Sequence, residues 1–171
     1  MDALKQSIEA AREQGRFLDQ SQMERFRVLF QKSEARLYIA KLITAHAAEL
    51  VEAVTSNHTN SDGIACLYCA DVLRHITYSL LAGNESILED DFLDRLIKDL
   101  VSLAGSIEPF RQAIGALKNA LLELLNAPTS RNNINQDYYG EIVNKVANDF
   151  DIITAHFRLE THRDRPQGTS P

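Results

Sequence analysis

Proline, glycine and cysteine are all scarce in this chain of 171 residues. The first of its four prolines is Pro109, and its seven glycines are spread thinly, so long stretches are free to be helical. Two cysteines are too few for a disulfide-rich secreted scaffold. No apolar run approaches the roughly 18 residues of a membrane span, so we expect no membrane insertion. The first residues lack the apolar core of a secretory signal, and we therefore expect a cytoplasmic protein.

Basic residues are also in the minority. The chain has 18 lysines and arginines against 24 aspartates and glutamates, which gives a net charge of −6. A surface built to neutralise phosphates has the opposite balance, so we expect no nucleic acid as a partner. With 44% hydrophobic and 25% charged residues, the composition is typical of a globular domain that buries its own apolar core.

Apolar residues recur at helical spacing along most of the chain, and no stretch shows the alternation of a half-buried strand. The pattern predicts an all-α protein of about seven helices. We expect an N-terminal helical pair in residues 1–32, a larger helical domain in residues 33–160 and a disordered polar tail in residues 161–171. The predicted helices span approximately residues 2–14, 19–32, 33–54, 64–81, 86–103, 107–125 and 137–159.

Five short motifs occur in a fixed order along the chain. They are Gln14–Asp19 (QGRFLD), Ser33–Arg36 (SEAR), Leu73–Asn84 (LRHITYSLLAGN), Ser86–Glu89 (SILE) and Gln112–Lys118 (QAIGALK). In this order they resemble motifs of the phycobiliprotein subunits, the light-harvesting proteins of cyanobacteria and red algae. The resemblance covers most of residues 1–159. It implies a globin-like fold with two extra N-terminal helices, which in that family mediate subunit pairing.

The positions that hold the bilin pigment in that family carry other residue types here. The resemblance places the pigment-attaching cysteine at Ala65 and the aspartate that binds the pyrrole nitrogens at Tyr68. The arginines near the pigment fall on Leu67, Asn60 and Ser61. A bilin needs a thioether, a carboxylate for its pyrrole N–H groups and cations for its propionates, and each group left unpaired costs roughly 1–3 kcal/mol. The resemblance therefore implies a pigment-free relative with no covalently bound cofactor.

A bilin or another tetrapyrrole held without a covalent bond remains an alternative. Its candidate binding residues are Cys66, Tyr68, Arg74, His75 and Tyr78. Arg74 would pair with a propionate. Cys66 lies next to the family's attachment point, so a thioether at this residue also stays open. The alternative interpretation is structural: Cys66 and Cys69 share a buried stripe, where cysteine packs as a small hydrophobic residue.

Other site chemistry has little support in the sequence. The pair Cys66–Cys69 lacks the βαβ context of a redox motif, and a zinc site would need two further ligands. Haem would need a proximal histidine in the predicted helix 86–103, which contains none. No phosphate-binding loop, nucleophile elbow or acid–base constellation is present, so we do not expect an enzyme or a metal site.

The first two predicted helices carry the candidate interaction surface. Its residues are Leu4, Ile8, Ala11, Arg12, Phe17, Met23 and Phe26, together with Arg74. In the family, an acidic residue of the first helix pairs with an arginine of the partner, and these positions are Arg12 and Arg74 here. Two like charges would then face each other, so we expect self-association in a different arrangement. Bilin-biosynthesis enzymes, or phycobilisome components at the thylakoid surface, are the other expected partners.

Overall fold

The computed structural model describes residues 2–15, 17–56, 62–83, 92–104, 108–131 and 134–163. Within these ranges every regular element is helical and none is a strand, which confirms the all-α prediction. The elements are α1 (Asp2–Glu13), α2 (Gln20–Thr55), α3 (Asp62–Ala82), α5 (Phe92–Ala104), α6 (Glu108–Asn126), a short 3-10 helix η1 (Pro128–Arg131) and α7 (Gln136–Arg163).

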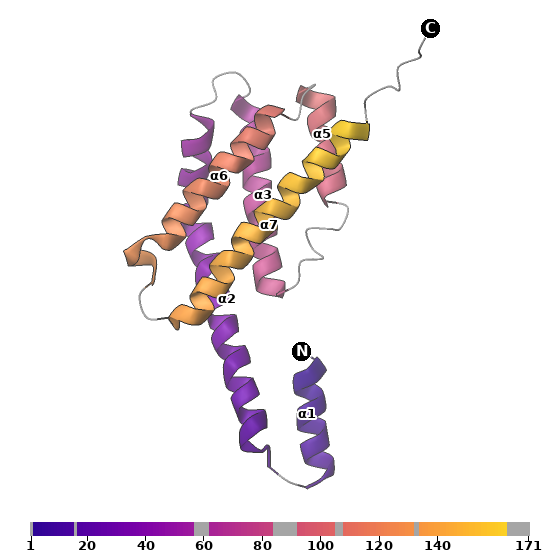
Figure 1. The fold of residues 1–171 in the computed structure, drawn as a ribbon, viewed down its shortest axis with the longest axis vertical. Coiled ribbons are helices and arrows are strands. Elements are labelled where there is room, and N and C mark those ends of the chain that lie inside the picture. Colours follow the sequence, from indigo (N-terminus) through magenta and orange to yellow (C-terminus); the bar gives the residue numbers. More distant parts are fainter. Residues whose placement is uncertain are drawn as a thin grey trace.

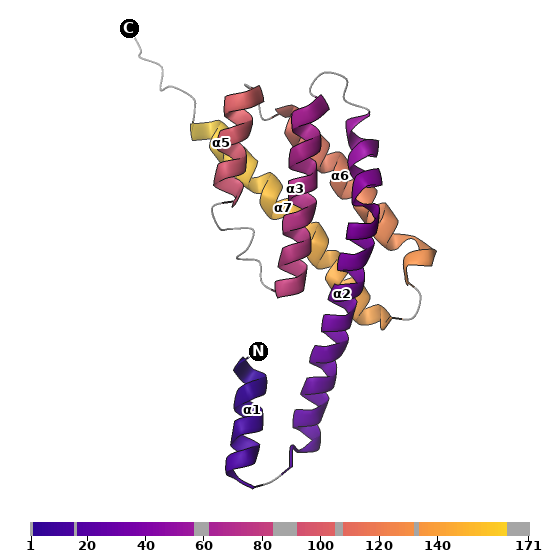
Figure 2. The same ribbon diagram turned by 180° about the vertical axis from the view of Figure 1, so that it is seen from behind.

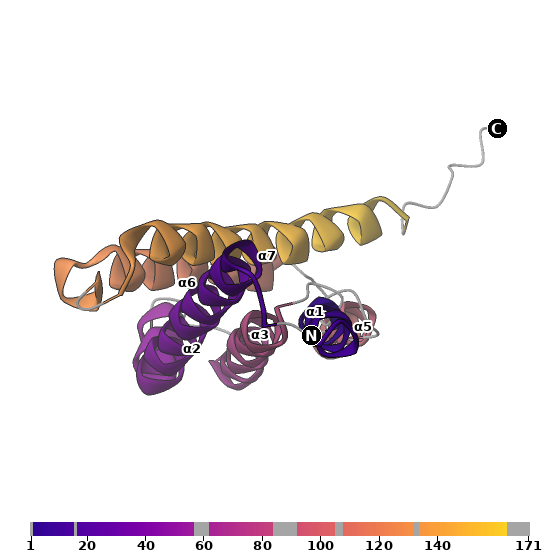
Figure 3. The same ribbon diagram turned by 90° about the horizontal axis from the view of Figure 1, so that it is seen from below.

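Two layers of helices form the body of the molecule. Helices α6 and α7 pack against each other and lie across α2 and α3 (Figures 1 and 3). Seen from behind, α5, α3 and α2 lie side by side (Figure 2). The core between the layers is apolar, with Ile39, Ile76, Leu117 and Phe150 all 0% exposed. The helical stripes of α3, α5, α6 and α7 therefore face a common core, whereas Phe30 and Leu37, on the predicted stripes of α2, are 67% and 47% exposed.

Helix α1 and the first half of α2 project from this body (Figure 1). Gly15 follows α1 with a φ of 60°, the left-handed conformation that commonly ends a helix. Asp19 then begins α2 with a capping box: its Oδ1 accepts from the Gln22 backbone N–H at 2.8 Å, and Gln22 Oε1 accepts from the Asp19 N–H at 3.0 Å. The local sequence thus fixes both ends of the turn that joins α1 to α2.

The predicted break at Ser33–Glu34 is wrong. Helix α2 is continuous for 36 residues, so the described chain has six α-helices where we expected seven, and the predicted domain boundary falls inside a helix. The Ser33 hydroxyl donates to the Leu29 backbone oxygen at 2.9 Å within the helix and caps nothing. Because residues 20–55 contain neither glycine nor proline, nothing interrupts the helical backbone there.

The other predicted boundaries differ by smaller amounts. Helix α7 continues to Arg163, three residues into the tail that we expected to be disordered, because the nearest proline is Pro166. Residues 164–171 lie outside the described residues, as does the start of the predicted helix 86–103.

Gly83 ends α3 and gives a first prediction. Its φ is 68°, and a Cβ at this position would overlap the guanidinium of Arg36, which would have to move. We expect Gly83→Ala to lower the free energy of unfolding by about 1–2 kcal/mol, because alanine is strained at this φ. Gly115→Ala is the control, since Gly115 lies inside α6 with open space around it. That substitution should stabilise by about 0.5–1 kcal/mol. Urea unfolding measures the free energy of unfolding of both variants. Equal effects of the two substitutions would contradict the claim that Gly83 is required for its positive φ.

Candidate functional site

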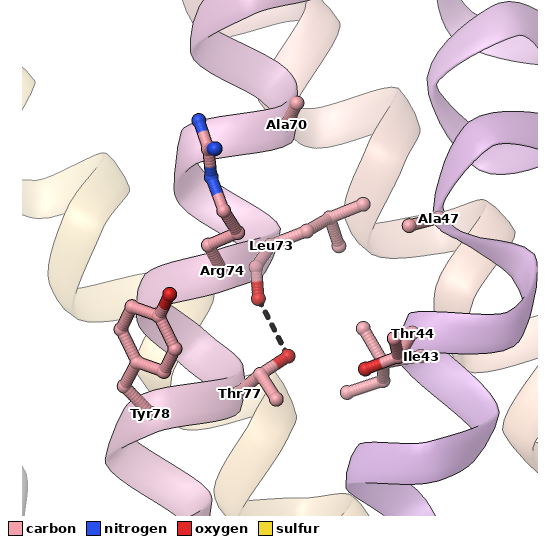
Figure 4. Close-up of a pocket in the computed structure, with 8 residues that line it drawn as sticks. All are labelled: Ile43, Thr44, Ala47, Ala70, Leu73, Arg74, Thr77 and Tyr78. Atoms are coloured by element: carbon pink, nitrogen blue, oxygen red, sulfur yellow. Dashed lines mark hydrogen bonds between the residues drawn. The ribbon is translucent and has the colours of Figure 1, made fainter.

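A pocket of about 360 Å³ opens between α2 and α3. Its lining residues are Ile43, Thr44 and Ala47 of α2 and Ala70, Leu73, Arg74, Thr77 and Tyr78 of α3. Leu73 reaches toward α2, whereas neither Arg74 nor Tyr78 does (Figure 4). The pocket thus has an apolar floor, with one cation and one phenol at its edge.

Three polar residues of this pocket, Thr44, Arg74 and Thr77, have partners within their own helices. The Thr77 hydroxyl donates to the Leu73 backbone oxygen at 2.8 Å (Figure 4), and the Thr44 hydroxyl donates to the Ala40 backbone oxygen at 2.8 Å. Arg74 forms an ion pair with Asp71, one turn earlier on α3. A polar ligand would therefore have to compete with these bonds, which makes the pocket chiefly an apolar surface.

The other face of α3 is filled by aromatic rings. Tyr68 packs edge-on against Phe110 of α6, with ring centroids 6.1 Å apart. The His75 ring stacks on Phe92 of α5 with centroids 3.4 Å apart, and its Nδ1 donates to the Asp71 backbone oxygen at 2.9 Å. These rings are held by packing between helices, which is the structural role that aromatic side chains usually have.

The five candidate bilin-binding residues therefore do not converge on one site. Arg74 and Tyr78 line the α2–α3 pocket, whereas Tyr68 and His75 pack toward α6 and α5. The side chain of Cys66 lies outside the described residues, and Cys69 is buried in the core. The Tyr78 ring also lies edge-on to the His75 ring, with the ring centroids 5.8 Å apart. These two side chains therefore meet where the pocket face of α3 borders its aromatic face.

Two carboxylates lie near Tyr68 and set its electrostatic environment. Burial of the phenol raises the pKa of Tyr68 above its ordinary value of 10.0, and the negative charges of Asp99 and Asp71 raise it further. Both causes disfavour an anion at this place. The surroundings of Tyr68 therefore disfavour a further negatively charged group.

The predicted interaction surface is exposed at most of its described positions. Phe17 is 98% exposed, and Met23 and Ile8 are 55% and 51% exposed. Arg12 is exposed and Phe26 half-buried, while Ala11 is buried and so belongs to the packing of the chain itself. The Leu4 side chain lies outside the described residues. Other large hydrophobic side chains that are exposed, and that were not predicted for this surface, are Leu29, Phe30, Leu37, Tyr78 and Leu81.

A buried polar cluster between α3 and α7 was also missed. Asp149 and Ser79 are 0% exposed, and the Ser79 hydroxyl donates to Asp149 Oδ2 at 3.2 Å. Lys145 Nζ lies 3.0 Å from Asp149 Oδ1, and the Lys145 side chain is 16% exposed. Asp149 lies three residues after Val146 on the apolar stripe of α7, and this position is the sequence signal that would have found it.

Two further kinds of site are absent from the described residues. None of the helices in these ranges has the length and apolarity to cross a membrane. In the same part of the chain, no three histidine, cysteine, aspartate or glutamate side chains come close enough to hold a metal ion.

The chain is similar to known proteins of the phycobilisome family. The family model described as "Phycobilisome protein" matches residues 6–63 and 57–157. The allophycocyanin beta chain of Thermosynechococcus vestitus is 34% identical over 145 residues, which is 76% of this chain and 90% of that protein. The allophycocyanin beta chain of Porphyra purpurea is 36% identical over 139 residues, 72% of this chain and 86% of that protein. The matches extend over both the projecting helices and the body.

Proposed function

This chain belongs to the phycobilisome protein family, and from that membership we propose that it is a pigment-free, non-catalytic member that acts through protein–protein contacts. Members of this family oligomerise and assemble into phycobilisomes. The process in which this chain takes part is bilin metabolism or the assembly and regulation of the phycobilisome. We place it in the cytoplasm, in association with phycobilisomes.

The observation that carries this proposal is the environment of Tyr68. In the resemblance to phycobiliproteins this position holds the aspartate that accepts the pyrrole N–H groups. Here a phenol ring occupies it and packs against Phe110. A ring in this contact offers no carboxylate, and a tetrapyrrole would have to displace it from the apolar packing. Ala65, at the attachment position, supplies no thiol.

The charges around this position also do not fit a bilin. Of the two carboxylates that influence Tyr68, Asp99 would repel a propionate of the pigment, whereas the charge of Asp71 is offset by Arg74. Arg74, the cation closest to this segment in sequence, is paired with Asp71. The residues around this position therefore do not fit a covalently held bilin, and this mismatch supports a role without pigment.

The interaction half of the proposal rests on the projecting helices. Ile8, Met23 and Phe30 are each more than half exposed on α1 and the first half of α2. Large apolar side chains exposed on a projecting segment favour an interaction site. We therefore assign protein binding to this surface.

A pull-down from a cyanobacterial lysate tests the interaction directly. We expect the chain to enrich phycobilisome components or bilin-making enzymes, identified by mass spectrometry, and Ile8→Asp to reduce that enrichment at least about tenfold. Ala155→Asp, which adds the same charge at an exposed position of α7, is the matched control. Absence of both protein classes from the wild-type eluate would contradict the proposal.

Non-covalent tetrapyrrole binding is the second candidate, and the α2–α3 pocket favours it. Its volume of about 360 Å³ lies at the lower end of the range for small-molecule sites, and Arg74 and Tyr78 stand at its edge. Titration with biliverdin and phycocyanobilin distinguishes the two candidates. A shift of the absorption band at tens of micromolar protein would favour the carrier, and an unchanged band would eliminate it.

A further inference from the structure

Helix α7 makes polar contacts with α2, α3, α5 and α6. Three of these contacts each include a carboxylate that is more than half exposed, and they join Glu141 to Lys32 of α2 at 2.7 Å, Asp151 to Lys118 of α6 at 2.6 Å and His156 to Asp94 of α5 at 3.0 Å. The fourth is buried, because Asp149 and Ser79 of α3 are both 0% exposed and their oxygens lie 3.2 Å apart. Exposed ion pairs contribute little, whereas a buried polar contact can select one packing among several.

The buried apolar residues of α7 repeat every seven positions. They form two rows along the helix, Tyr139–Val146–Ile153 and Val143–Phe150–Phe157. If α7 moved along its own axis by seven residues, roughly 10 Å, both rows would again place apolar side chains on the core. The nine residues 127–135 between α6 and α7 reach roughly 30 Å when extended, so the connection permits such a shift. Hydrophobic burial alone therefore distinguishes poorly between two registers of α7.

Asp149 breaks this repeat. It is the polar member of the buried residues that the structure describes on α7, and the residue seven positions before it, Ile142, is 2% exposed. A shift that brings Ile142 to the place of Asp149 would leave the buried Ser79 hydroxyl against an aliphatic side chain, without this carboxylate as its acceptor. Such a loss is costly at a buried position. The contact between Ser79 and Asp149 therefore favours one register over the other.

Lys145 has a different part in the same cluster. Its ammonium lies 3.0 Å from Asp149 Oδ1, and it also donates to Ser79 Oγ at 3.5 Å. Because Lys145 and Asp149 are both on α7, their ion pair would move with the helix in any shift. The pair makes burial of the carboxylate tolerable, and Ser79 on α3 is the fixed point against which the position of α7 is set.

We propose that Ser79, Lys145 and Asp149 form a register lock, which selects one position of α7 along α3. The lock also determines where α7 begins. In the selected register the start of α7 lies against the middle of α2, where the projecting half of α2 joins the body (Figure 1): the Lys32 ammonium lies 5.7 Å from the centroid of the Tyr138 ring, and Tyr38 packs edge-on against Tyr139. This inference goes beyond the proposed function and does not depend on it.

A distance measurement between α6 and α7 tests the lock. Nitroxide labels are attached at Glu123→Cys and Ala155→Cys, two exposed positions, in a background where Cys66 and Cys69 are replaced by alanine. Double electron–electron resonance should give a single distance for this protein. The triple variant Ser79→Ala, Lys145→Met and Asp149→Leu should remain helical and show a second distance roughly 10 Å from the first, because apolar cores lose uniqueness before they lose stability.

Two further variants separate register selection from a general loss of packing. Lys118→Met with Asp151→Leu removes an exposed ion pair of α7 and should keep the single distance. Lys145→Met with Asp149→Asn removes both charges but keeps an acceptor for Ser79, and it should also keep the single distance. A single distance in the folded triple variant would overturn the proposal. So would a triple variant that does not fold, because the cluster would then supply stability and not register.

Discussion

Replacing Lys145 by methionine is expected to lower the free energy of unfolding by about 3–5 kcal/mol. Asp149 is 0% exposed, and the Lys145 ammonium, 3.0 Å from its Oδ1, supplies a positive charge beside it. Methionine preserves most of the apolar stem and removes the charge. The buried carboxylate would keep the Ser79 hydroxyl and lose this neutralising charge. Urea unfolding at neutral pH measures the effect.

Two variants separate this effect from the loss of an ordinary ion pair. Lys118 pairs with Asp151 between α6 and α7 at 2.6 Å, but Asp151 is 65% exposed, so Lys118→Met should cost about 1 kcal/mol or less. Lys145→Met combined with Asp149→Leu should recover most of the lost stability, because neither charge then remains buried. If Lys145→Met lowers the free energy of unfolding no more than Lys118→Met does, then Lys145 does not stabilise the fold by neutralising the buried Asp149.

Replacing Phe110 by alanine is expected to cost a similar amount, about 3–5 kcal/mol. The Phe110 ring is 3% exposed and lies between Tyr68 of α3 and Phe157 of α7, at 6.1 and 5.3 Å between centroids. Its removal leaves a cavity beneath Tyr68 and takes away two edge-on ring contacts.

The control for this prediction is another loss of an apolar side chain in the same fold. Leu81 is 52% exposed at the end of α3, so Leu81→Ala should change stability by about 0.5 kcal/mol or less. Thermal or urea unfolding of the two variants gives the comparison. Equal losses would mean that the Phe110 ring is not part of the packed core.

The helices and their buried faces could be predicted from sequence because each apolar stripe repeats at helical spacing. Ile114 and Leu121 of α6, and Val146 and Phe150 of α7, are 0% exposed as such stripes predict. The break at Ser33 could not be judged in the same way. Serine favours both a helix cap and a bond to the backbone one turn earlier, and only the path of the chain decides between them.

The candidate site was harder to predict than the fold because proximity in sequence does not place side chains on one face of a helix. Arg74 and Tyr78 are four residues apart and share a face, whereas Tyr68 and His75 are seven apart and share another. A helical projection separates the two pairs. It does not show that Phe110 and Phe92 fill the space beside the second pair, since those rings come from distant segments of the chain.

The most direct test of the central claim is co-expression of this chain with a bilin supply, followed by zinc-enhanced fluorescence of a denaturing gel. A pigmented phycobiliprotein subunit serves as the positive control, and Cys66→Ala shows whether any label depends on that thiol. We predict a stained but non-fluorescent band, because Ala65 and Tyr68 stand where attachment and pyrrole binding require a thiol and a carboxylate. A fluorescent band that survives denaturation would contradict the account.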